Sequence, residues 1–61
     1  MPVIELKTLG KRSHEQKAEI TKRFTETLQE VAGKPPEYTY VIIHEIEREN
    51  WGHRGVLFSD K

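Results

Sequence analysis

The stretch YTYVIIHEI, residues 38–46, decides the fold of this chain. It is nearly continuous in β-branched and aromatic residues, which favour β-strands. A strand with one face in water would alternate apolar and polar residues, so a continuous run is typical of a strand that is covered on both faces. This pattern predicts a central or parallel strand whose partner comes from elsewhere in the chain.

The first residues of the chain supply a partner strand. Ile4 and Leu6 lie on one side of an imperfect alternation, and polar residues lie between them on the other side. Such a period of two predicts a strand over residues 2–8. Residues 10–12, Gly-Lys-Arg, break the pattern and are expected to form a loop.

A helix is predicted between the two strands, over residues 14–32. Ser13 and Gln16 have the spacing of a capping box, in which the Ser hydroxyl accepts from the Gln backbone N–H and the Gln side chain reaches back to the Ser N–H. Gly33 stands where a left-handed C-terminal cap is favoured. Pro35-Pro36 prevent the helix from continuing.

The predicted helix is amphipathic. Its apolar residues recur at spacings of four, four and three, which aligns them in one stripe along a charged helix. Glu19 and Arg23 have the i,i+4 spacing of an ion pair on the outer side. The stripe consists of Ile20, Phe24, Leu28 and Val31, flanked by Ala18 and Ala32.

Strand, helix and strand with short connections form a right-handed βαβ unit. One helix covers only one face of a two-stranded sheet, so we expect a second copy of the chain to cover the other face. Residues 51–55, Trp-Gly-His-Arg-Gly, predict a tight hairpin or loop. Residues 56–58 then predict a short apolar strand that has no place in its own subunit and pairs with a neighbour.

Length and composition limit what this chain can be. A chain of 61 residues forms one domain, residues 1–61, with a marginal core, and it contains no Cys for disulfides or thiolate metal sites. Oligomerisation is therefore the expected source of additional stability. Ten Lys and Arg balance ten Asp and Glu without a basic block, which argues against nucleic acid or a membrane surface as a partner.

Other partners and cofactors are also not expected. No apolar run reaches the ~20 residues of a membrane span and no export signal begins the chain, so we expect a cytoplasmic protein. The three histidines, His14, His44 and His53, lie in different predicted elements without ligand-spaced partners, so we expect no metal site. No motif for a cofactor is present.

Pro2 is the one unusual candidate base. Removal of an initiator Met before a small residue would leave Pro2 with a free secondary amine at the head of a strand. An N-terminal amine has a reference pKa of about 7.7–8.0, and burial or a nearby cation lowers it. A group with that pKa is an effective general base at neutral pH. If Met1 is retained, the Pro2 nitrogen is an amide with no proton to exchange.

Taken together, these motifs resemble the 4-oxalocrotonate tautomerase family over essentially the whole chain. Each motif alone is weak, but a proline at the second position, an arginine ten residues later and an aromatic-glycine hairpin form a fairly specific set. The residues that carry the resemblance are Pro2, the run Leu9-Gly10-Lys11-Arg12-Ser13, the helix start Ser13-His14-Glu15-Gln16-Lys17, the strand Val41-Ile42-Ile43-His44-Glu45, and Asn50-Trp51-Gly52 with Gly55.

The resemblance implies an isomerase that assembles as a homohexamer, a trimer of βαβ dimers. It implies that Pro2 is the base that moves a proton from the 2-hydroxyl of a dienol to a distant carbon. Arg12 matches the arginine that binds a substrate carboxylate and draws electrons along the diene. Leu9 matches a position whose backbone touches the substrate, and Trp51 stands where the family usually has a Phe that walls the pocket.

The chain departs from the family pattern at the second arginine of the site, which aligns with Tyr40. A phenol donates one hydrogen bond but carries no charge at neutral pH, so a dicarboxylate loses part of its binding. Monoacids and aryl-enolpyruvates are therefore the favoured substrates, with Tyr40 polarising the keto oxygen. Alternatively Arg54, at a position where the family usually has Gly, returns the charge from the hairpin, and Lys11 is a weaker candidate.

Two other functions remain open from the sequence. The first is hydratase or dehalogenase chemistry on the same proline, which requires an acidic residue to activate water, and no carboxylate has a clear claim to that role. The second is a non-catalytic oligomeric binding module, which retention of Met1 would favour.

Overall fold

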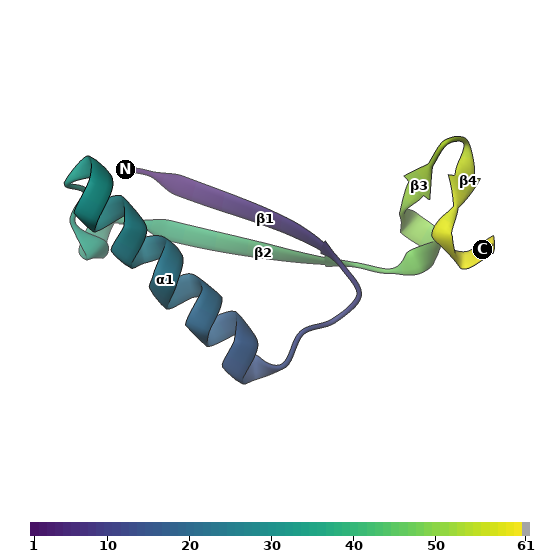
Figure 1. Cartoon of the computed structure of the whole chain (residues 1–61), viewed down its shortest axis with the longest axis horizontal. Helices are drawn as coiled ribbons and strands as arrows, with labels where there is room; N and C mark the ends of the chain where they lie inside the picture. The colour runs from purple at the N-terminus through teal and green to yellow at the C-terminus, as the bar shows by residue number, and fades with distance from the viewer. Residues whose placement is uncertain (61) are drawn as a thin grey trace.

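A computed structural model describes residues 1–60 and contains the expected βαβ unit. Strands β1 (Val3–Leu9) and β2 (Tyr40–Ile46) run parallel and in full register, and helix α1 (His14–Ala32) lies along one face of the pair (Figure 1). The predicted first strand is confirmed with a shift of one residue. The second strand is shorter than the apolar run, because Pro36–Tyr38 form a turn of 3₁₀ helix before it.

The ends of α1 lie where the sequence predicts them. The Ser13 hydroxyl accepts from the Gln16 N–H at 3.2 Å, and the Ser13 N–H donates to the Gln16 side chain at 3.1 Å, so the capping box is confirmed. Gly33 has φ 65° and its N–H donates to the carbonyl of Gln29 at 3.1 Å. A left-handed residue at this position ends the helix because it turns the chain out of the helical path.

The apolar stripe of α1 faces the sheet, but it covers it only partly. Ile20, Phe24 and Leu28 are half-buried, and no side chain among residues 1–60 is fully buried. Val31, predicted as part of the stripe, is instead 82% exposed. It lies two residues before the C-terminal cap Gly33, in the last turn of the helix.

The other face of the sheet is open in a single chain. Val3, Tyr40 and Ile42 are between 44% and 51% exposed there. His44 Nε2 lies 3.2 Å from the Glu5 carboxylate on the same face. Exposed apolar side chains gathered on one face are typical of an interaction surface. Within residues 1–60, no helix is long and apolar enough to cross a membrane.

The C-terminal residues form a separate arm beyond the end of the sheet (Figure 1). After a 3₁₀ turn, Arg48–Asn50, strands β3 (Gly52–His53) and β4 (Val56–Leu57) pair antiparallel. The prediction that residues 56–58 find no partner in their own subunit is therefore wrong. A two-residue turn between the strands returns the chain onto itself, so β4 pairs locally.

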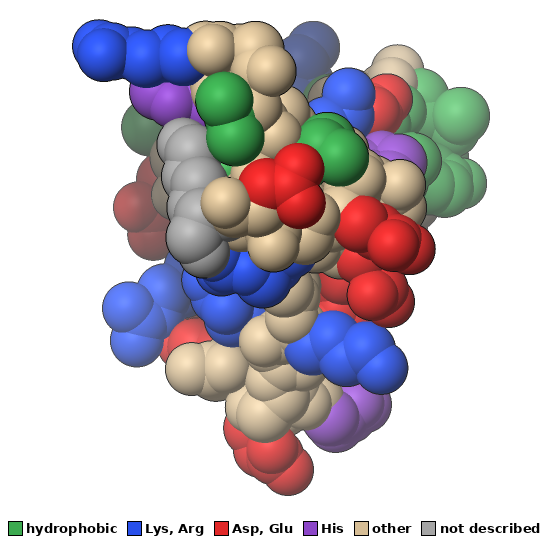
Figure 2. All heavy atoms as spheres, turned by 90° about the vertical axis from the view of Figure 1, so that its right-hand side faces the viewer, with side chains coloured by type: hydrophobic (Ala, Val, Ile, Leu, Met, Phe, Trp, Pro, Cys, Tyr) green, Lys and Arg blue, Asp and Glu red, His purple; other side chains and the backbone are tan. Residues whose placement is uncertain are grey.

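The arm has a small aromatic centre of its own. The ring of Phe58 lies 6.2 Å from that of Trp51 and 6.4 Å from that of His53, and the Arg48 guanidinium lies 5.8 Å over it. Arg48 also donates to the Phe58 carbonyl at 3.0 Å. Seen from this end, hydrophobic side chains reach the surface between acidic and basic ones (Figure 2).

Candidate active site

The candidate site residues fall into two groups at opposite ends of the sheet. Pro2 and Tyr40 lie at the end where both strands begin. The Tyr40 N–H donates to the Pro2 carbonyl at 3.0 Å, which ties the half-buried proline to the head of the sheet. Met1, which precedes it, is 82% exposed.

The second group lies where the strands end. Leu9 is the last residue of β1 and stands beside Ile46, the last residue of β2. Gly10 follows with φ 77°, and its N–H donates to the Ile46 carbonyl at 2.8 Å. This conformation strains any residue with a Cβ, and it lets the chain turn sharply from the sheet into the loop that carries Arg12.

Arg12 lies in the loop between β1 and α1, with its backbone held by a strand carboxylate. Its N–H donates to Glu45 Oε2 at 2.8 Å, and the other oxygen of Glu45 accepts from Lys17 Nζ at 3.0 Å. The Arg12 guanidinium donates to the Lys11 carbonyl at 3.3 Å and belongs to none of the ion pairs between residues 1–60. The guanidinium is therefore available to an incoming anion.

The sequence analysis assigned no role to Glu45. The signal that could have found it is its place in the alternation of β2, where it follows Val41 and Ile43 on the side that faces α1. A carboxylate at that position needs a polar partner. The hydrogen bond from the Arg12 backbone, followed by that from Lys17, lowers the pKa of Glu45 below its ordinary value.

The loop and the end of the sheet enclose a shallow cleft of about 170 Å³. Arg12 does not line this cleft. It borders a neighbouring open groove on the side of α1. Neither of these two clefts includes Pro2. The first cleft, at the end of the sheet, is lined by Gly10, Lys11, Glu45, Ile46, Glu47 and Arg48.

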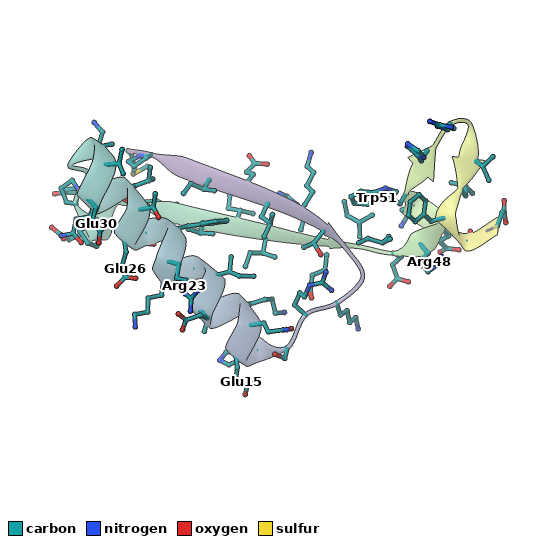
Figure 3. The ribbon with its side chains drawn as sticks, viewed as in Figure 1. Glu15, Arg23, Glu26, Glu30, Arg48 and Trp51 are labelled. Carbon is teal, nitrogen blue, oxygen red and sulfur yellow. The ribbon has the colours of Figure 1, made fainter. Side chains whose placement is uncertain are left out.

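The arm carries Trp51 and Arg54. Trp51 is half-buried at the base of the hairpin (Figure 3). Arg54 is exposed in the turn with φ 56°, a left-handed conformation that is uncommon for a residue other than Gly. Tyr40 and Arg54, the alternatives for the missing second arginine, therefore lie at opposite ends of β2.

Pro2 and Arg12 do not meet within one chain. The seven residues of β1 separate them, and at about 3.3 Å per residue this corresponds to about 20 Å. A proton-transfer site needs its base and its anion-binding group around one small molecule. One chain by itself supplies these groups at two separate places.

The comparisons with known proteins agree with this architecture. The family model described as tautomerase enzyme matches residues 2–61. The chain belongs to the tautomerase family. It is 39% identical over 56 residues to the 2-hydroxymuconate tautomerase of Comamonas testosteroni. The matched segment covers 92% of this chain and 89% of that protein.

Solved structures of tautomerases share the same fold. A homologue of 4-oxalocrotonate tautomerase is 41% identical with a TM-score of 0.92, over 100% of this chain and 97% of that one. A heterohexamer 4-oxalocrotonate tautomerase from Chloroflexus aurantiacus is 25% identical with a TM-score of 0.86, over 98% of this chain and 97% of that one. The present chain is therefore an isomerase, a tautomerase of the 4-oxalocrotonate tautomerase type.

Proposed function

We propose that this tautomerase converts the enol form of a 2-hydroxydienoate or an aryl-enolpyruvate to the keto form, with the Pro2 amine as the base. The observation that carries the proposal is the attachment of Pro2 to the head of the sheet through the Tyr40 N–H, in a chain of the tautomerase family. That attachment orients the proline ring while Met1 remains exposed and accessible to removal.

The proposed reaction is a proton transfer with no change of oxidation state. The free amine of Pro2 takes the proton from the 2-hydroxyl, the electrons of that O–H bond form the carbonyl, and the conjugated double bonds shift toward the distant carbon. That carbon then takes the proton back from the Pro2 ammonium. In an aryl-enolpyruvate the carbon that takes the proton is C3, directly beside the enol carbon. A base whose pKa lies near the working pH serves both steps efficiently.

Arg12 binds the substrate carboxylate in this proposal, and it comes from a second copy of the chain. A second β1 placed antiparallel to the first would bring the loop that follows it to the head of the first strand. This arrangement would close the separation of about 20 Å that β1 imposes within one chain. A guanidinium offers a forked donor that matches a carboxylate, and its charge would also favour the neutral form of the amine.

Leu9 and Trp51 would border the same pocket and keep water out of it. Leu9 lies directly before the loop of Arg12, and the half-buried ring of Trp51 lies at the base of the arm. Excluding water strengthens the electrostatic contacts of the site. We propose a homohexamer as the assembly that builds this pocket. The related 4-oxalocrotonate tautomerase from Chloroflexus aurantiacus is also a hexamer, built from different chains.

The second polar contact to the substrate comes from Tyr40 or Arg54. The Tyr40 backbone N–H donates to the Pro2 carbonyl, so Tyr40 lies at the same end of the sheet as Pro2, which supports a monoacid substrate whose keto oxygen the phenol polarises. Arg54 would act from the arm of another copy and would favour a second carboxylate. We propose the monoacid, because Tyr40 and Pro2 lie at the same end of the sheet. Hydratase or dehalogenase chemistry requires an acidic residue to activate water, and no carboxylate in the sequence has a clear claim to that role, which leaves it the less supported alternative.

The first experiment measures the intact mass of the native protein. We expect the mass of the chain without Met1, because only that chain has a basic nitrogen at Pro2. A retained Met1 would contradict the mechanism and would favour a non-catalytic binding module.

The second experiment measures ketonisation of phenylenolpyruvate. We expect Pro2→Ala to lower kcat by about 100-fold, the usual contribution of a positioned general base. Arg12→Ala should raise KM, because it removes the carboxylate contact. Glu26→Gln, on the outer side of α1, is the control and should match the parent (Figure 3). Equal rates for the parent, Pro2→Ala and Arg12→Ala would show that the proposed site is wrong.

A further inference from the structure

One carboxylate, that of Glu45, joins three elements of the fold. Glu45 lies on β2, its Oε2 accepts from the backbone N–H of Arg12 at 2.8 Å, and its Oε1 accepts from Lys17 Nζ on α1 at 3.0 Å. The contact spans 33 positions in sequence between Arg12 and Glu45. The contact is therefore tertiary.

The loop around Arg12 is held on both sides. Before it, the Gly10 N–H donates to the Ile46 carbonyl at 2.8 Å. After it, Ser13 is held by the capping box of α1. Between these anchors, Glu45 provides the one hydrogen bond that the Arg12 backbone N–H makes within residues 1–60. This bond therefore holds the backbone at the residue that carries the guanidinium.

We propose that Glu45 is a positioning residue, which fixes the backbone of Arg12 so that its guanidinium meets the substrate carboxylate in the right orientation. The inference rests on the proposed function, in which Arg12 binds that carboxylate. Arg12 is exposed, so water replaces the lost acceptor when Glu45 is removed, and the cost falls on orientation more than on folding. A misplaced binding group weakens substrate binding even when the chain remains folded.

The charge of Glu45 fits this role. Its pKa is lowered, first by the Arg12 backbone hydrogen bond and then by Lys17, with Lys11 as a further nearby cation. A carboxyl with a lowered folded-state pKa contributes stability above its unfolded pKa, and this contribution is lost as the pH falls through the folded value. At neutral pH, Glu45 is therefore ionised and accepts from both partners.

The kinetic test is a double-mutant cycle on phenylenolpyruvate with Glu45→Ala, Arg12→Ala and the combined variant. We expect Glu45→Ala to raise KM about tenfold while kcat stays within about twofold, the size of a lost contact to a charged group. In the Arg12→Ala background, Glu45→Ala should add nothing, because both changes remove the same contact. Glu26→Gln controls for the loss of one negative charge on the surface.

Additive effects of the two changes would overturn the inference, because Glu45 would then act through another group. The inference alone is wrong if Arg12→Ala raises KM and Glu45→Ala does not. If Arg12→Ala itself leaves KM unchanged, the proposed substrate contact is wrong and the inference falls with it.

A second measurement does not depend on activity. In the parent, the NMR chemical shift of the Arg12 backbone amide proton should titrate as the pH falls below the ordinary carboxyl pKa of about 4.3. The same proton should not titrate in Glu45→Gln, which keeps the shape of the side chain but has no ionisable group. An Arg12 amide that is insensitive to pH in the parent would show that the hydrogen bond is not formed in solution, which overturns the inference.

Discussion

Arg54 has a backbone conformation that is unfavourable for a residue with a side chain. It occupies the first position of the hairpin turn with φ 56°, and Gly55 follows with φ 80°. Gly adopts this conformation without steric cost, whereas a side chain with a Cβ does not. Strained residues of this kind cluster at functional sites, which is why Arg54 is worth testing as the alternative to Tyr40 for the second contact to substrate. The sequence identified Arg54 as unusual, but its backbone conformation emerged only in the structure.

Replacing Arg54 separates its effect on the stability of the turn from any contact with a substrate carboxylate. Arg54→Gly should raise the free energy of unfolding by about 1 kcal/mol per chain, measured by urea denaturation at one fixed protein concentration, because it relieves the left-handed strain. Gly55→Ala, the matched control in the same turn, should lower it. If Arg54 also binds a second carboxylate, Arg54→Gly should raise KM for 2-hydroxymuconate and leave KM for phenylenolpyruvate unchanged. Lower stability in Arg54→Gly would contradict the turn geometry.

At the scale of elements, α1 is the part of the chain that the sequence predicts best. Its start and its end depend on contacts between residues close in sequence, and these contacts form in the structure as expected. Glu19 and Arg23 also pair at 2.7 Å. The prediction was wrong at Val31, which is 82% exposed, because helical periodicity does not determine which residues of a stripe the rest of the fold covers.

The capping box should contribute measurably to stability. Ser13→Ala should lower the free energy of unfolding by about 1 kcal/mol, because it leaves the Gln16 N–H without its side-chain acceptor. Thr27→Ala, within the same helix, is the control and should be neutral or slightly stabilising, because Ala has the higher helix propensity. Thermal unfolding at one protein concentration measures both. Equal losses in the two variants would indicate a general sensitivity of α1 and not a capping effect.

At the scale of the whole molecule, one chain leaves apolar side chains uncovered. No residue between 1 and 60 is fully buried, and Tyr40 and Ile42 expose an apolar face of the sheet. The separation of Pro2 from Arg12 along β1 gives the same indication, because the groups of one proposed site lie at two ends of the sheet. Self-association would both cover the apolar face and bring these groups together.

Disrupting that face should abolish assembly and activity together. Ile42→Lys places a charge in the centre of the open sheet face, and desolvating it would cost more than the contact with a second copy returns. We expect sedimentation to show smaller species than the parent, with loss of phenylenolpyruvate ketonisation. Glu26→Lys also adds positive charge, but on the outer side of α1, and should leave assembly unchanged. An active monomeric Ile42→Lys variant would show that one chain carries the complete site.

The sequence by itself determined the βαβ order, the bounds of α1, the tight turn after Trp51 and the resemblance to a tautomerase. These features depend on periodicity, capping and turn residues, which act between neighbours in the chain. Only the tertiary structure decided that Glu45 holds the backbone of Arg12 and that the Tyr40 N–H donates to the Pro2 carbonyl. Those relations depend on the register of two strands that are more than thirty positions apart, and no pattern within a short stretch of sequence specifies that register.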